Sequence, residues 1–66
     1  MYEEKKLRAA LAEKEITPRR VCLEIGMNER TFYRRMRDGK WNTAQVRAIH
    51  NAAGFSPETT CDIFLT

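Results

Sequence analysis

Apolar residues recur at helical spacing along most of the chain, and no segment shows the strict alternation that is typical of a half-buried strand. Between Tyr2 and Lys14 most residues are strong helix formers, and Leu7, Ala10 and Leu11 fall on one side of a helix. The charged residues of this segment lie mostly on the other side. The pattern predicts a first amphipathic helix over residues 2–14.

Residues that start and stop helices mark the next element. Thr17 is a suitable N-cap and Pro18 is suited to the first helical position, which predicts a helix over about residues 18–25. Gly26 then provides the positive φ that commonly ends a helix. Asn28, two residues later, is a good cap for a further helix.

That further helix is expected over about residues 29–37. Phe32 and Met36 are one turn apart and should face inward. The outer side then carries four large polar side chains, Arg30, Tyr33, Arg34 and Arg37.

The last third of the chain predicts two more helices. Asn42 and Gln45 have the spacing of a capping box, so a helix should begin near Thr43 and end at Gly54. Ser56 followed by Pro57 opens a short final helix. This helix carries the apolar residues near the C-terminus, Cys61, Ile63, Phe64 and Leu65.

Five short helices in 66 residues predict an all-α fold, a compact five-helix bundle forming a single domain over residues 1–66. A core this small is marginal, so a second subunit is a reasonable partner. The two cysteines form no C-x-x-C pair and the single histidine has no second one nearby, which excludes a structural zinc site. We expect a cytoplasmic protein, because the sequence has neither a secretory leader nor an apolar run long enough for a membrane helix.

Charge is concentrated in one part of the chain. Residues 17–39 have the layout of a helix-turn-helix, with Cys22 as a small side chain where the two helices cross. Residues 17–40 carry seven basic and three acidic side chains, whereas the remaining residues carry five basic and six acidic ones. Six of the seven are arginines, whose planar guanidinium binds phosphate or a guanine edge through two parallel hydrogen bonds. This segment is therefore suited to nucleic acid.

The same segment resembles the phage-repressor and Cro-like helix-turn-helix regulators, also called the Xre family. The resemblance spans most of the chain and rests on Thr17, Val21, Cys22 (where alanine is usual), residues 25–28, 31–34 and Gly39, then Trp41, Asn42, Val46, Ile49 and residues 63–65. It implies a lambda-repressor-like domain that binds DNA, although some domains of this kind bind proteins instead.

The resemblance also implies roles for individual residues. It places Glu29, Arg30, Tyr33 and Arg34 at positions that face base edges in the major groove. Arginines there suit guanines, the tyrosine suits a thymine methyl or a phosphate, and the glutamate can accept from a cytosine amine. The implied contacts to the DNA backbone are Thr17, Arg19, Asn28, Arg37, Lys40 and Asn42. In the family this position usually holds a glutamine, which donates a hydrogen bond to a phosphate. Pro18 has no such donor, so Arg19 is the natural substitute for that contact.

We therefore predict a sequence-specific transcriptional regulator of phage or prophage type. It would bind double-stranded DNA as a homodimer and repress by occluding a promoter. Phe64 and Leu65 are the expected dimer contacts, and the alternative is that Ile63 and Phe64 close the core of the single chain.

The competing functional interpretation is a mobile-element protein that uses the same fold to bind another protein, as an inhibitor or antirepressor. Catalysis is not expected, because no nucleophile pairs with a base and no phosphate-cradling glycine loop is present. His50, with no catalytic partner nearby in sequence, is expected at the surface or at a dimer contact. No cofactor, metal or small-molecule ligand is expected.

Overall fold

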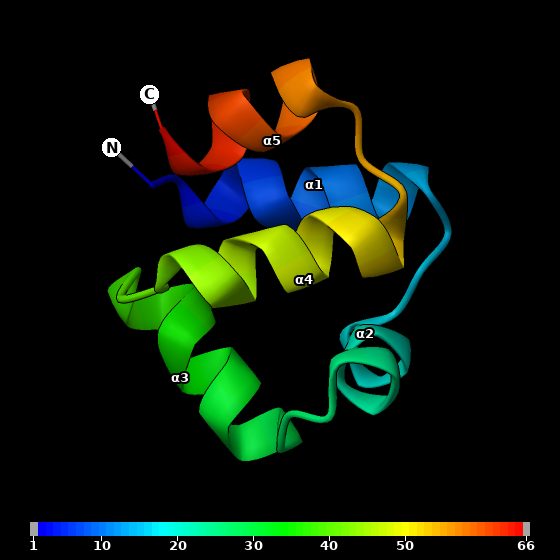
Figure 1. The fold of residues 1–66 in the computed structure, drawn as a ribbon, viewed down its shortest axis with the longest axis vertical. Helices are drawn as coiled ribbons and strands as arrows, with labels where there is room; N and C mark the ends of the chain where they lie inside the picture. The colour runs from blue at the N-terminus through cyan, green and yellow to red at the C-terminus, as the bar shows by residue number, and fades with distance from the viewer. Residues whose placement is uncertain (1, 66) are drawn as a thin grey trace.

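The computed structural model of the protein describes residues 2–65. In this range the regular elements are five α-helices: α1 (Glu4–Glu13), α2 (Pro18–Ile25), α3 (Glu29–Asp38), α4 (Thr43–Ala53) and α5 (Pro57–Phe64) (Figure 1). The predicted all-α fold with five helices is confirmed. The bounds of α2, α3 and α4 agree with the predicted ones to within one residue.

The predicted caps close four of the five helix starts. The side chains of Thr17, Asn28 and Ser56 each accept a hydrogen bond from a backbone N–H in the first turn of α2, α3 and α5. Asn42 and Gln45 form both bonds of the capping box, at 2.7 and 3.0 Å. These bonds satisfy backbone donors that have no partner within the helix, so each start is defined locally.

The first helix differs from its prediction. It begins at Glu4, not at Tyr2, and ends at Glu13, with Lys14 as its C-cap. The reason is tertiary: the backbone N–H of Glu3 donates to the carbonyl of Ile63 at 3.0 Å, and the Tyr2 hydroxyl donates to the carbonyl of Met36 at 2.8 Å. These contacts hold Tyr2 and Glu3 against α3 and α5, and no sequence pattern indicates them.

The helices form two groups that share α4 (Figure 1). One group contains α1 and α5, which pack on each other, and the other contains α2 and α3. Helix α4 lies between them and packs against both α2 and α5. Both ends of the chain lie beside α1 and α5, at the opposite side of the molecule from the α2–α3 turn. Nδ1 of His50 in α4 is hydrogen-bonded to the hydroxyl of Thr60 in α5 at 2.8 Å, so this pair links the two helices.

A continuous apolar core joins the two groups. Its largest fully buried side chains come from every helix: Leu7, Val21, Phe32, Met36, Ile49 and Ile63. Phe64 is also buried, with 8% of its surface exposed, and its ring stacks on Tyr2 at 5.6 Å between centroids. Ile63 and Phe64 are thus both covered within the chain, as the alternative in which they close its core predicts. Leu65 remains 73% exposed.

Candidate nucleic-acid interface

The turn between α2 and α3 is fixed by the backbone at each of its residues. Gly26 adopts φ +70°, and its N–H donates to the carbonyl of Cys22, as does that of Met27 at 3.0 Å. Asn28 then accepts from the N–H of Arg30 at 2.7 Å and begins α3. Cys22 is buried, and burial raises the pKa of its thiol. The backbone hydrogen bonds of the turn and the Asn28 cap therefore fix the orientation of α3 against α2.

Helix α3 has a buried side and a basic exposed side. Phe32 and Met36 are completely buried. The exposed side carries the α3 stripe, which we define as Arg30, Tyr33, Arg34 and Arg37. Their spacing of i, i+3, i+4 and i+7 places them along one face of the helix. Within residues 2–65 none of the three arginines forms an ion pair, so their guanidinium groups are available to an anion.

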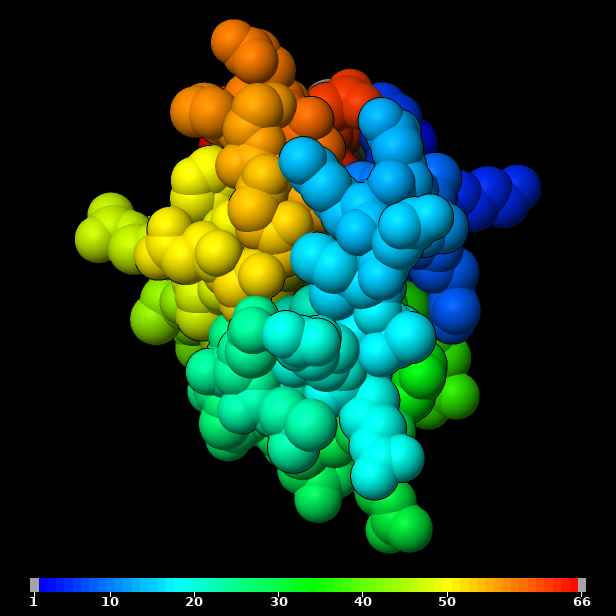
Figure 2. All heavy atoms as spheres, turned by 90° about the vertical axis from the view of Figure 1, so that its right-hand side faces the viewer, coloured from blue at the N-terminus to red at the C-terminus, as the bar shows by residue number. Residues whose placement is uncertain are grey.

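Figure 2 shows side chains of the α3 segment, in green, projecting from the end of the molecule that α2 and α3 form. Tyr33 belongs to this surface but is 37% exposed, because its ring meets the edge of Phe32 at 6.3 Å and 85°. The stripe thus combines one aromatic side chain that packs on the core with three exposed arginines that form no ion pair within residues 2–65.

The residues predicted to contact phosphates are all exposed, and they lie at three helix starts and at the C-terminal end of α3. Thr17, Asn28 and Asn42 each use a side-chain oxygen as a cap, which leaves the threonine O–H and the two amide NH₂ groups as free donors. Lys40 follows α3, and its backbone N–H donates to Asp38. These donors suit an anionic backbone that passes over the helix starts.

Glu29 and Arg19 are brought together across the turn. Oε1 of Glu29 lies 3.8 Å from Nε of Arg19, and both side chains are largely exposed. The sequence predicted separate roles for the two residues, one at a base and one at a phosphate. Their proximity was not predicted, because it depends on how α2 and α3 cross.

Arg35 is a second feature that the sequence did not single out. Its side chain is half-buried, and its Nε has no hydrogen-bond partner within the described part of the chain. Arg35 follows Phe32 by three residues and therefore borders the buried side of α3. This position separates it from the α3 stripe, and the same spacing is visible in the sequence.

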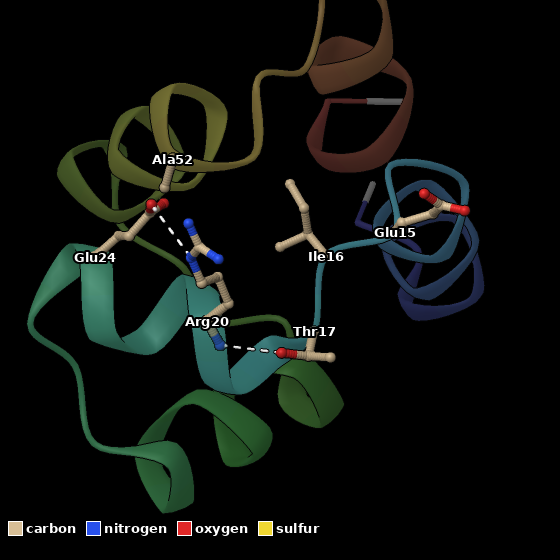
Figure 3. A pocket seen from close by; sticks show the side chains of 6 residues that line it. All are labelled: Glu15, Ile16, Thr17, Arg20, Glu24 and Ala52. Carbon is tan, nitrogen blue, oxygen red and sulfur yellow. Dashed lines mark hydrogen bonds and ion pairs between the residues drawn. The ribbon is translucent and has the colours of Figure 1, made fainter.

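A surface hollow of about 350 Å³ lies beside α2, away from the α3 stripe (Figure 3). Its lining comes from the α1–α2 connection, α2 and the end of α4: Glu15, Ile16, Thr17, Arg20, Glu24 and Ala52. Nε of Arg20 lies 3.7 Å from Glu24, and Figure 3 shows the two side chains meeting below Ala52. Arg20 and Glu24 are thus already paired with each other, and Glu15 is the third charge of the lining.

No group of three or more potential metal ligands occurs in residues 2–65, and no helix in the same range is both long and apolar enough to cross a membrane. The chain matches no protein-family model, and no curated protein or solved structure is significantly similar to it. The residues and their geometry therefore carry the assignment of function.

Proposed function

We propose that the protein is a sequence-specific DNA-binding transcriptional regulator with a lambda-repressor-like helix-turn-helix. One observation carries the proposal: the three arginines of the α3 stripe are exposed and unpaired on a helix whose opposite side is completely buried. A rigid helix with unpaired, forked cations along one face suits the major groove, which admits an α-helix and displays guanine acceptors.

In this proposal Arg30 and Arg34 bind guanines, and Tyr33 contacts a thymine methyl or a phosphate. Arg37, Lys40 and the first backbone N–H groups of α4 hold phosphates. The concentration of positive charge in residues 17–40 supports this division, because phosphate contacts provide much of the affinity and base contacts the specificity.

The regulator acts as a homodimer and represses by occluding a promoter. Leu65 supports a contact between two copies, because it is apolar, 73% exposed and adjacent to the buried Phe64. Residues 51–66 contain no lysine or arginine, which suits a surface turned away from DNA. With twofold symmetry the operator is an approximate palindrome, with half-sites about 34 Å apart.

Selection of bound duplexes from a random DNA pool tests the proposal. The expected result is an enriched palindromic sequence whose affinity falls steeply with salt, with log K decreasing by about 0.9 per decade of salt for each phosphate neutralised. A pool without enrichment, or binding to a protein partner that salt barely weakens, would contradict it. Sedimentation of the wild type and of Leu65→Asp, with and without the selected duplex, tests the dimer.

A further inference from the structure

Glu29 lies at the edge of the α3 stripe, on the side of α3 that faces α2. Successive residues of an α-helix are about 100° apart around its axis, so Glu29 and Arg30 cannot project in the same direction. Its carboxylate approaches Arg19 at 3.8 Å across the turn. The Glu29 charge also contributes, after burial, to the raised pKa of the Cys22 thiol of α2.

The ion pair uses Nε of Arg19, as the Nε–Oε1 distance shows. A guanidinium has five N–H donors in a planar fork, so an approach through Nε leaves the two terminal nitrogens free. Arg19 is 78% exposed, which leaves these nitrogens accessible to a phosphate. Glu29 can therefore orient the fork without occupying it.

We propose that Glu29 is a positioning residue, which holds the Arg19 fork toward a DNA phosphate and does not read a base. This proposal rests on the proposed function, since it specifies how the same surface grips DNA. The pair joins the start of α3 to α2, so it couples the phosphate contact of α2 to the placement of α3 in the groove. Arg20 provides the contrast, because its partner Glu24 lies on its own helix and links no second element.

A double-mutant cycle with Arg19→Ala, Glu29→Ala and the double variant tests the proposal on the selected duplex and on duplexes with single base changes. Deleting a carboxylate near DNA removes repulsion and by itself favours binding, so a loss of affinity identifies orientation as the cause. Glu29→Ala is expected to weaken all duplexes alike, about two- to fivefold, as is typical of the loss of one exposed ion pair. In the Arg19→Ala background the same change should cause no further loss.

Two matched variants sharpen the cycle. Glu29→Gln removes the charge but keeps the length of the side chain. Because 3.8 Å is an ionic contact and too long for a hydrogen bond, this variant should weaken binding about as much as Glu29→Ala. Glu24→Ala breaks the other exposed pair of α2, at 3.7 Å, and should leave the coupling between Glu29 and Arg19 unchanged. Relaxed preference at one base position, an equal loss in both Arg19 backgrounds, or unchanged or tighter binding by Glu29→Ala would each overturn the positioning role.

A readout without DNA separates this proposal from the proposed function. In the free protein, the ¹⁵N-detected Nε–Hε resonance of Arg19 should shift in Glu29→Ala and stay in place in Glu24→Ala. An unshifted resonance would show that the pair is absent and overturn the positioning role alone. A wild type that binds no duplex would instead overturn the proposed function, and the positioning role with it.

Discussion

The α3 stripe and the α1–α5 side of the molecule use charge in opposite ways. Along α3 the arginines have no acidic partner within residues 2–65. On the other side Lys6 of α1 bonds Asp62 of α5 at 2.9 Å, and Arg8 bonds Glu4 at 2.8 Å. Lys6 and Arg8 are thus paired within the chain on this side, whereas the arginines of the α3 stripe are unpaired within residues 2–65.

This difference separates residues that serve the fold from residues that are available to a partner. The Lys6–Asp62 bond joins α1 and α5, two helices that are far apart in the sequence. The α3 arginines join nothing within the described chain, and their like charges repel one another. An anion on this face relieves the repulsion, whereas the charges of Lys6 and Arg8 already have acidic partners.

The buried side chains of α3 hold the helix in place, so truncating one of them should have the largest effect on stability. Phe32→Ala deletes a completely buried ring and should lower the free energy of unfolding by about 3–5 kcal/mol. A 66-residue domain has little stability to spare, so much of the variant should be unfolded at 37 °C. Urea denaturation checks the result. Arg34→Ala is the control from the same helix and should stay within about 0.5 kcal/mol of the wild type.

Gly39, at the C-terminal end of α3, lies where α3 meets the side chain of Tyr2. A Cβ at this position would lie 2.8 Å from Cδ2 of Tyr2, and Gly39 also has φ +72°. Gly26 has nearly the same φ but nothing within 4 Å of such a Cβ. Gly26→Ala should therefore show the backbone cost alone, about 1–2 kcal/mol, and Gly39→Ala roughly 1–3 kcal/mol more for displacing Tyr2. Equal melting temperatures of the two variants would show that Tyr2 moves away freely.

Arg34→Ala tests the functional half of the comparison directly. It should cost about 1–3 kcal/mol of binding free energy on the selected duplex and relax the preference at one base position. Arg8→Ala, which removes a paired arginine of α1, should leave DNA binding unchanged. Fluorescence anisotropy on the selected duplex and on its single-base variants measures both. Equal losses for the two variants would remove the distinction between the two sides.

The smallest effect concerns alkaline pH, and it belongs to the α1–α5 side. The hydrogen bond from Lys6 to Asp62 raises the pKa of Lys6 above its ordinary 10.5, and burial raises the pKa of Tyr2 above 10.0. Both contributions to stability are complete below these ordinary values and are lost as the pH rises through the raised ones. The melting temperature should therefore fall above about pH 10.

Two variants divide this alkaline fall between its sources. Tyr2→Phe has no hydroxyl to ionise and should remove the tyrosine part, and Asp62→Asn should remove the lysine part. A melting profile with the same alkaline fall in both variants would contradict the assignment. DNA binding is measured at neutral pH and should not differ among the three proteins.

The sequence predicted local features of the fold well, because their causes are local. The caps at Thr17, Asn28 and Asn42 bond to residues at most three positions away, so spacing alone indicates them. The buried and exposed sides of α3 follow from helical geometry in the same way. These features give the bounds of the central helices and the composition of the α3 stripe.

Features that depend on tertiary contacts were missed or uncertain. Tyr2 was predicted to be helical, but its hydroxyl bonds to Met36, 34 positions away. For Phe64 the sequence left a dimer contact and closure of the core as alternatives, because it cannot show that the ring of Tyr2 stacks on Phe64. The Arg19–Glu29 pair depends on the crossing of two helices, which periodicity does not define.

The hydrogen bond between Glu3 and Ile63 holds the N-terminal and C-terminal segments of the chain side by side. Both ends leave the molecule together, on the far side from the α2–α3 turn (Figure 1). A short linker can therefore join them without disturbing α3, and new ends can be opened in an exposed connection such as the one at Lys14 and Glu15. The helices can thus be connected in another order without changing the surface that α3 presents. A fluorescent reporter or a second copy fused at either end also leaves the α3 stripe unobstructed.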